Sequence, residues 1–267
     1  MLQTTTVEKR TLELLKQLQS QSEFSNFHLA GGTALALYLG HRKSIDLDLF
    51  TPYPFNTTRL EHSLVTKFGF QGDYSEQNTL KGRIDGIKID CITHPYPLLR
   101  TPLDEEGVRL YSEPDIIAMK LSAIADNGSR LKDFIDIAYL STRYSFQEML
   151  GFYVQKFPTS SPLRPLKGIT YFDDIDHEET VVMLEGTYSW QKIADRLQAM
   201  TAHQSKVFAS PPLFPARKSS EIIVPSSPVQ AQAQAILDAK KGKGQGSPAL
   251  KTEQEVQADS KSYRHKR

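Results

Sequence analysis

The chain has 267 residues, of which 39% are hydrophobic and 24% charged, and its formal net charge is +1. These values indicate a globular protein with a sizeable core, and no apolar run approaches the ~20 residues that a membrane-spanning helix requires. The first residues lack the order of a signal peptide, and the single cysteine, Cys91, excludes an internal disulfide and a thiolate-rich zinc site. We therefore expect a cytoplasmic protein that has no membrane partner.

Charge is distributed unevenly along the chain. Residues 1–208 hold 22 Lys+Arg against 26 Asp+Glu, whereas residues 209–267 hold 10 against 5. The acidic balance of the longer part argues against a nonspecific nucleic-acid binder, although it leaves room for a local basic groove. The basic end is rich in Pro, Ser, Gln, Ala and Lys, which favours disorder, with a short helix over 229–241 as an alternative.

Hydrophobic periodicity predicts a succession of helices and strands. The predicted elements are, in chain order, helices over 7–20 and 33–40, a strand over 44–50, a helix over 57–70, two short strands over 83–93, and helices over 112–127, 130–143, 145–157 and 189–204. Ser112 is placed to cap the helix that follows it, with Pro114 in the first turn and Asp115 at the capping-box position.

This order of elements predicts an α+β (α/β) protein with a small mixed sheet. We expect a catalytic core over 1–111, a helical subdomain over 112–208 and a low-complexity, disordered tail over 209–267. The acidic residues between Asp173 and Glu179 match no calcium loop, so they predict a solvated surface segment. Trp190 is expected to be a packing anchor under the last helix.

Gly31, Gly32 and Thr33 stand at the start of a predicted helix. Glycine lets the backbone approach a phosphate closely, and a helix N-terminus offers free N–H groups to an anion. Because Gly-Gly pairs are also common in ordinary turns, this signal is weak by itself.

Asp46 and Asp48 alternate with Ile45, Leu47 and Leu49 on the predicted strand. Residues i and i+2 of a strand face the same way, so both carboxylates should project together while the aliphatic residues enter the core. Strands disfavour aspartate, and carboxylate oxygens suit Mg²⁺. The alternative is a strand face with solvated charges.

Asp90 lies on the later strand IKIDCIT, flanked by apolar residues. An adjacent strand would bring its carboxylate to the same metal ions as Asp46 and Asp48, and three carboxylates would then support a two-metal site for phosphoryl chemistry. Taken alone, an aspartate such as Asp90 is more often a surface residue than a metal ligand. His41 and His94 do not have a metal-ligand spacing.

The order Gly-Gly-Thr, short helix, S-x-D-x-D and later Asp resembles the DNA-polymerase-β-like nucleotidyltransferases. Within them the chain is most similar to the AbiEii/AbiGii family of abortive-infection type IV toxins. The segments that carry the resemblance are LAGGTALALYLGHRKSIDLDLF, GIKIDCITHPY and DIIAMKLSAIADNGSRLKDFIDIAYL, which together span about residues 28–142. The resemblance implies Mg²⁺ (or Mn²⁺) at Asp46, Asp48 and Asp90, and nucleotide transfer from an NTP to an RNA acceptor (the 3′ end of a tRNA) or a protein hydroxyl. It also implies a cognate antitoxin protein.

The resemblance assigns further roles. Lys120 matches a lysine that meets the nucleotide phosphates, although a lysine at this position can also extend to solvent. Asp133 or Asp136 is expected to act as a base or to support Lys120; alternatively, Arg130–Asp133 and Lys132–Asp136 are ordinary helix-surface pairs. In the loop before the strand, Arg42 and Lys43 either add positive charge near the phosphates or form a solvated turn. Ser44 either hydrogen-bonds a γ-phosphate or caps the loop.

Two other functions fit the same residues. One is a small-molecule phosphotransferase, which would release a nucleoside diphosphate instead of pyrophosphate. The other is a non-catalytic nucleotide-binding module that keeps the fold and binds a partner.

Overall fold

The computed structural model describes residues 1–214, which belong to one compact unit, Met1–Arg217. Most of the predicted tail over 209–267, including the alternative helix over 229–241, lies outside the described residues. In the described part of the chain, no helix is long and apolar enough to cross a membrane.

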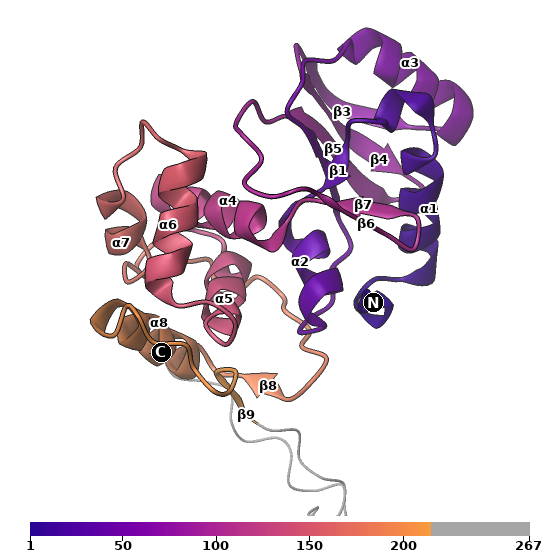
Figure 1. The fold of residues 1–267 in the computed structure, drawn as a ribbon. Coiled ribbons are helices and arrows are strands. Elements are labelled where there is room, and N and C mark those ends of the chain that lie inside the picture. The colour runs from indigo at the N-terminus through magenta and orange to yellow at the C-terminus, as the bar shows by residue number, and fades with distance from the viewer. Residues whose placement is uncertain (215–267) are drawn as a thin grey trace, which may run out of the picture. The chain divides into compact units, whose positions relative to one another are not determined.

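A seven-stranded mixed sheet forms the first half of this unit (Figure 1). Its strands are β1 (His28–Leu29), β2 (Leu47–Thr51), β3 (Gln71–Glu76), β4 (Thr79–Ile84), β5 (Ile87–Thr93), β6 (Leu103–Glu105) and β7 (Val108–Leu110). They lie in the order β3-β4-β5-β2-β1-β7-β6, with β2/β5 and β1/β7 parallel and the other pairs antiparallel. The expected mixed α/β class with a small mixed sheet is confirmed.

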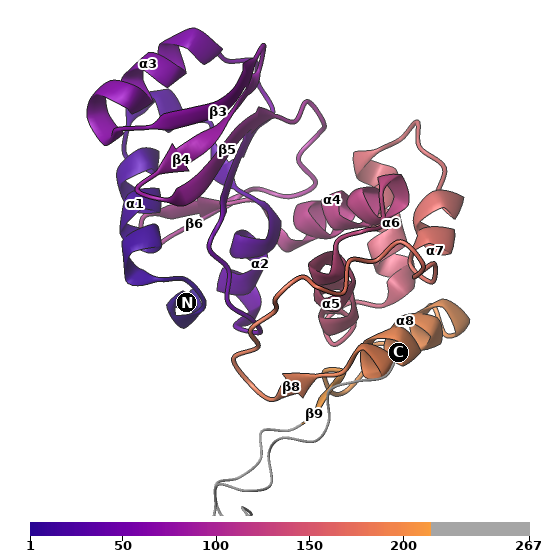
Figure 2. The same ribbon diagram turned by 180° about the vertical axis from the view of Figure 1, so that it is seen from behind.

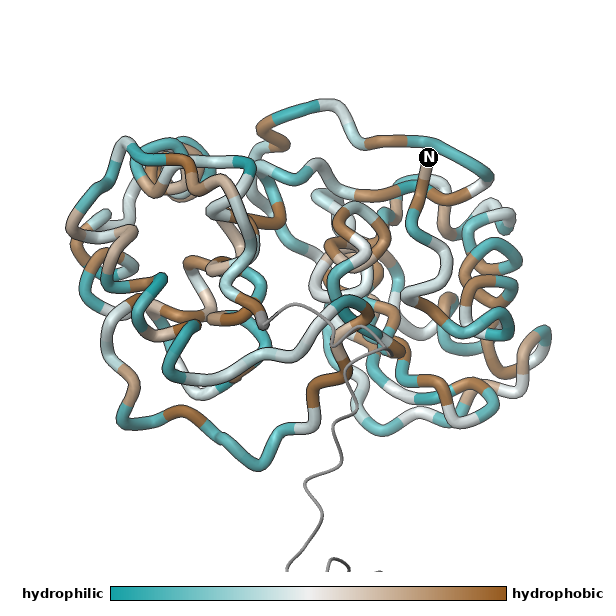
Figure 3. The backbone as a smooth tube through the Cα atoms, turned by 90° about the horizontal axis from the view of Figure 1, so that it is seen from below, coloured by the Kyte–Doolittle hydropathy of each residue, from teal (hydrophilic) through white to brown (hydrophobic). Residues whose placement is uncertain are grey.

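The helices divide into two groups, which Figures 1 and 2 show from opposite sides. Beside the sheet lie α1 (Lys9–Gln19), α2 (Gly31–Leu39) and α3 (Thr57–Phe68). The second group comprises α4 (Glu113–Asp126), α5 (Leu131–Leu140), α6 (Phe146–Lys156), α7 (Leu163–Gly168) and α8 (Trp190–Ala202). A two-stranded ribbon of β8 (Thr187–Tyr188) and β9 (Leu213–Phe214) flanks α8. Along the helices, hydrophobic and hydrophilic stretches alternate, as one buried and one exposed face require (Figure 3).

Local sequence signals explain where several helices begin and end. The Ser112 hydroxyl accepts the Asp115 N–H at the start of α4, and Ser145 forms a capping box with Glu148 at the start of α6. Gly40 and Gly69 end α2 and α3 in the left-handed conformation that glycine adopts without strain. The Asp115 carboxylate does not complete a capping box, because it is drawn to Lys156 Nζ at 2.7 Å and to the Leu99 N–H.

The two faces of the sheet differ in chemistry. Side chains such as Leu47, Leu49 and Ile89 enter the hydrophobic core. The opposite face carries Asp48 and Phe50 on β2, Lys88, Asp90 and Ile92 on β5, Thr79, Lys81 and Arg83 on β4, and Tyr74 on β3. We call this second face the carboxylate face.

Ile45 departs from the prediction that it enters the core. The strand begins only at Leu47, so Ile45 lies in the preceding loop and is 59% exposed. Residues 31 and 32 depart too, because α2 begins at Gly31 and the pair opens the helix instead of preceding it.

Candidate active site

Asp48 and Asp90 lie side by side on the carboxylate face. They are Cα partners in the parallel pair β2/β5, so their side chains leave adjacent strands in the same direction. Asp90 is 6% exposed, and its Oδ1 is buried without a hydrogen-bond partner among residues 1–214. A buried, unpartnered carboxylate oxygen is costly unless a further ligand satisfies it.

The electrostatics of Asp48 reflect this proximity. Burial, and next the charge of Asp90, raise the pKa of Asp48 from 3.8 to about 6; Lys88 and Arg130 partly oppose the rise. A cation bound between Asp48 and Asp90 would reverse it, because it favours both ionised carboxyls.

Asp46 lies one residue before β2, so the two-residue alternation of the strand does not extend to it. Its backbone carbonyl accepts a hydrogen bond from the Thr33 hydroxyl, which also bonds Ser44 Oγ at 2.8 Å. Across residues 1–214, no three or more His, Cys, Asp or Glu side chains are grouped so as to hold a metal ion. The structure therefore brings together Asp48 and Asp90, while Asp46 as a third ligand stays a prediction.

The two glycines at the start of α2 permit close contacts with side chains. Gly31 has φ +64°, and a Cβ at this position would overlap Asp48 Oδ2. A Cβ at Gly32 would lie 2.6 Å from Arg42 Nη2. Both positions require glycine because charged groups of the site pack directly on the helix start.

A buried ion-pair network lies behind this helix start, centred on Asp136 of α5. Arg42 places Nε 2.7 Å from Asp136 Oδ1 and Nη2 2.8 Å from Oδ2, and His41 Nε2 is 2.7 Å from Oδ1. Lys120 Nζ of α4 lies 2.7 Å from both Asp136 Oδ2 and Asp133 Oδ1. Although burial alone would raise it, Arg42 and Lys120 hold the pKa of Asp136 well below its usual range.

This network decides between several alternatives that the sequence left open. Arg42 is 2% exposed and Lys120 5%, so neither a solvated turn nor a solvent-reaching lysine describes them. Lys132 pairs with Glu179 at 3.1 Å, and the expected surface pair Lys132–Asp136 is absent from the ion pairs of residues 1–214. Of the expected surface pairs, Arg130–Asp133 is present, at 4.0 Å.

A cavity of about 360 Å³ opens beside Asp48. Its lining comprises Gly32, Thr33, Arg42, Lys43, Ser44, Ile45, Asp46, Asp48, Arg130, Lys132, Glu179, Thr180 and Val182. Four of the predicted nucleotide-binding residues (Gly32, Thr33, Arg42 and Ser44) line the cavity, whereas Gly31 and Lys120 do not. Arg130, Lys132 and Glu179 also line it, although no nucleotide-binding role was predicted for them.

Glu179, Thr180 and Val182, from the segment between α7 and α8, line one wall of this cavity. The other acidic residues of the segment, Asp173, Asp174, Asp176 and Glu178, are exposed, as their composition predicted. Lys43 N donates to Val182 O at 2.8 Å, and Asp176 N donates to Ser129 O at 2.8 Å. No local signal marks these contacts, since Lys132 and Glu179 are 47 residues apart. Trp190 packs edge-on against Phe134 and Phe172, as an anchor would.

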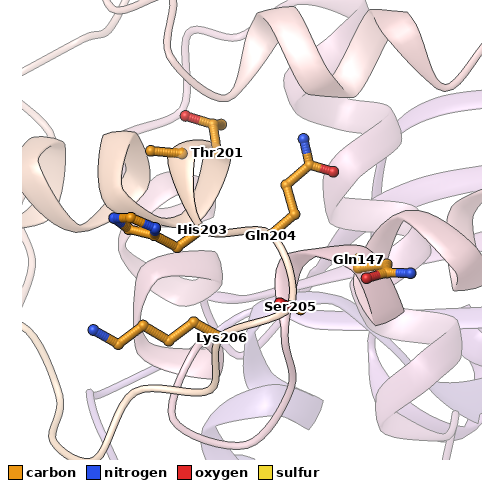
Figure 4. Close-up of a pocket in the computed structure, with 7 residues that line it drawn as sticks. Gln147, Thr201, His203, Gln204, Ser205 and Lys206 are labelled. Carbon is orange, nitrogen blue, oxygen red and sulfur yellow. The ribbon is translucent and has the colours of Figure 1, made fainter.

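A second cavity, of about 580 Å³, lies at the end of α8. It is lined by Gln147, Thr201, Ala202, His203, Gln204, Ser205 and Lys206. The labelled side chains do not converge on a common point (Figure 4), and the cavity shares no residue with the carboxylate site.

Residues 13–79 and 74–209 match a family model described as nucleotidyl transferase AbiEii toxin, type IV TA system. The model that these residues match is that of a nucleotidyltransferase family. The chain belongs to the AbiEii family of toxins of type IV toxin–antitoxin systems.

Individual relatives include the uncharacterized protein aq_aa25 of Aquifex aeolicus (strain VF5), 32% identical over 178 residues that cover 64% of this chain and 86% of the relative. Among solved structures, JHP933 from Helicobacter pylori shares 15% identity at a TM-score of 0.45, covering 88% of this chain and 99% of that one. MenT4, a nucleotidyltransferase toxin from Mycobacterium tuberculosis H37Rv, shares 15% at a TM-score of 0.47, covering 73% and 80%.

Proposed function

We propose that this protein transfers a nucleotide from a nucleoside triphosphate to an acceptor, either an RNA such as the 3′ end of a tRNA or a protein hydroxyl. Asp48 and Asp90, with Asp46 as third ligand, would hold Mg²⁺ or Mn²⁺. The observation that supports this proposal most directly is the register of β2 and β5, which pairs Asp48 with Asp90. As a family toxin, the protein would be restrained by a cognate antitoxin.

The chemistry of the donor set fits a hard divalent cation. Two adjacent carboxylates repel each other, and Asp90 Oδ1 lacks a hydrogen-bond partner in the described part of the chain. Oxygen ligands with open coordination suit Mg²⁺, which binds through one or two carboxylates together with substrate phosphates. When bound, such an ion would neutralise phosphate charge and activate the attacking hydroxyl.

The chain's own residues would position the triphosphate in the 360 Å³ cavity. The first N–H groups of α2 attract anions, and Lys43, Arg130 and Lys132 add positive charge at the cavity wall. Thr33 holds the loop at Ser44 and Asp46 in place through its hydroxyl.

Arg42 and Lys120 would act as positioning residues. Both side chains pair with Asp136 of α5, whereas Lys120 lies on α4 and Arg42 in the loop before β2, so the ion pairs hold these three segments together. Phosphate contact by Lys120 would require it to exchange one of its two carboxylate partners, Asp133 or Asp136, for substrate.

The test is transfer of label from [α-³²P]NTPs to total tRNA and to cell protein. Asp48→Asn and Asp90→Asn should abolish transfer, whereas Asp126→Asn, which alters an exposed pair with Arg164, should retain it. Full activity in either site variant would reject the assignment.

Two further readouts separate the alternative functions. Pyrophosphate release supports nucleotidyl transfer, whereas nucleoside diphosphate release identifies a phosphotransferase. A rise of the melting temperature with Mg²⁺ and NTP, without any transfer of label, would identify a non-catalytic nucleotide-binding module, because a ligand that binds the folded state stabilises it.

A further inference from the structure

Three basic side chains cluster on the carboxylate face, beyond Asp90 and away from the cavity. Lys81 on β4 is the register partner of Asp90, and Arg83 is the partner of Lys88 on β5. Their side chains are 40%, 52% and 42% exposed for Lys81, Arg83 and Lys88. This cluster is the local basic surface that the acidic balance of residues 1–208 conceals.

Tyr74 extends this row to the edge of the sheet. It is the register partner of Lys81 on β3 and is 46% exposed. The row across the strands is therefore Tyr74, Lys81, Asp90 and Asp48, from an aromatic ring through a cation to the paired carboxylates.

The two sides of the carboxylate pair differ. The cavity beside Asp48 is lined by the start of α2 and by Arg130 and Lys132, whereas Lys81, Arg83 and Lys88 are not part of its lining. If the cavity holds the triphosphate, an acceptor has to approach from the other side, over β5 and β4.

We propose that the carboxylate face over β3, β4 and β5 binds single-stranded nucleic acid, with Lys81, Arg83 and Lys88 contacting phosphates and Tyr74 stacking on a base. This inference rests on the proposed function and names the acceptor class. Proteins bind single-stranded nucleic acids through exposed aromatic rings beside basic side chains, because the bases stack on the rings while the phosphates of the nucleic acid contact the positive charges. An acidic peptide would use the cations and leave the ring without a role.

The present contacts of the two lysines add a condition. Lys88 Nζ lies 3.3 Å and Lys81 Nζ 3.8 Å from Asp90 Oδ2, so both are counterions of the carboxylate that the divalent cation would take. A cation on Asp90 would displace them and free their charge for phosphate. Among the residues that the structure describes, Arg83 forms an ion pair with Asp73 alone, at 3.7 Å, and both side chains are exposed.

The first experiment measures binding of a fluorescein-labelled 12-nucleotide single-stranded RNA by anisotropy, at a fixed Mg²⁺ concentration and without NTP. The double variant Lys81→Gln/Lys88→Gln should bind the RNA more weakly. The slope of log K against log salt concentration should decrease in magnitude by about 1.4 in this variant, at ~0.7 for each phosphate contact to a single strand. The matched control, Lys9→Gln/Lys167→Gln, removes the same charge from exposed positions on α1 and α7. Equal loss in both pairs would overturn the proposal.

The second experiment tests the exchange of counterions. Adding Mg²⁺ at constant ionic strength should tighten RNA binding by the unaltered protein, the reverse of ordinary screening. Asp90→Asn should bind RNA more tightly than the unaltered protein in EDTA and should not respond to Mg²⁺. Glu76→Gln removes a negative charge from the same face and a hydrogen-bond partner of Tyr74, but it leaves Asp90 and its contacts with Lys81 and Lys88 unchanged, so this variant should still respond to Mg²⁺.

The outcomes separate this inference from the proposed function. If Mg²⁺ with NTP raises the melting temperature but the RNA is bound equally by the unaltered and the Lys81/Lys88 proteins, the nucleotide site stands and the RNA surface falls. Tighter binding of a labelled poly-glutamate peptide than of the RNA would also overturn the surface, in favour of a protein acceptor.

Discussion

Replacing Asp136 by asparagine removes the one charge that Arg42 and Lys120 share in the protein interior. Asp136 is fully buried, and its two oxygens accept hydrogen bonds from Arg42 and contact His41 and Lys120 at 2.7–2.8 Å. The asparagine keeps the shape but leaves Arg42 without its partner, and Lys120 with Asp133 alone.

The expected magnitude follows from this burial. Breaking a buried ion pair by removing one partner costs about 3–5 kcal/mol, because an uncompensated charge remains inside. An exposed pair contributes about 0–1 kcal/mol. The matched control is Asp126→Asn, whose partner Arg164 lies 2.6 Å away with both side chains more than half exposed.

Urea unfolding at pH 7 followed by circular dichroism provides the measurement. We expect Asp136→Asn to lower the free energy of unfolding by about 3–5 kcal/mol and Asp126→Asn by less than about 1 kcal/mol. The pKa of Asp136 is depressed in the folded state, so its stabilisation is present above the unfolded value near 4 and is lost as pH falls through the folded value. The difference between the unaltered protein and Asp136→Asn should therefore persist from pH 7 to pH 5. A loss below about 1 kcal/mol would refute the network as a structural element and return Asp136 to the role of an accessible base.

Three further predictions concern the site and its surroundings. Gly31→Ala should abolish nucleotide binding and destabilise the protein more than Gly69→Ala, measured by thermal shift, since both glycines have positive φ but only a Cβ at 31 meets Asp48; equal effects would exclude this contact. Asp48→Asn should stabilise the metal-free protein at pH 8 by up to about 3 kcal/mol, at 1.36 kcal/mol for each pKa unit, because a carboxyl whose folded pKa is raised to about 6 loses stability as pH rises from 3.8 to that value. Burial, and next the charge of Lys156, lower the pKa of His94 to about 4, so stability should fall as pH drops from 6.5 to 4, and His94→Gln should flatten that decline in urea titrations.

Much of the fold was accessible from periodicity, and the exceptions have physical causes. The apolar spacing of residues 7–20 and the cap at Ser112 located α1 and α4 to within a few residues. β3 escaped prediction because every residue of Gln71–Glu76 is exposed, so this edge strand has no buried face to create an alternating pattern. Ile45 was wrongly predicted to enter the core because the alternating sequence pattern starts before Leu47, where the strand itself begins.

In the candidate site, the residues that lie on patterned strands could be predicted from the sequence, whereas contacts between residues far apart in the chain could not. The pairing of Asp48 with Asp90 follows from two strands that each carry a buried face, and their register places the carboxylates together. By contrast, the bond from Arg42 to Asp136 spans 94 residues, and nothing near either residue distinguishes a buried partner from a solvated charge. The place of Glu179 in the cavity lining could not be predicted for the same reason, because it depends on the path of the backbone between α7 and α8 and not on composition.

The bond between Arg42 and Asp136 also limits how the chain can be divided. Arg42 belongs to the stretch that precedes β2, and its counterion arrives only with α5. A recombinant fragment that stopped after the last strand of the sheet would retain the guanidinium in its interior without an anion. The uncompensated charge would destabilise such a fragment by about 3–5 kcal/mol, so the sheet depends on a helix that follows it in the chain.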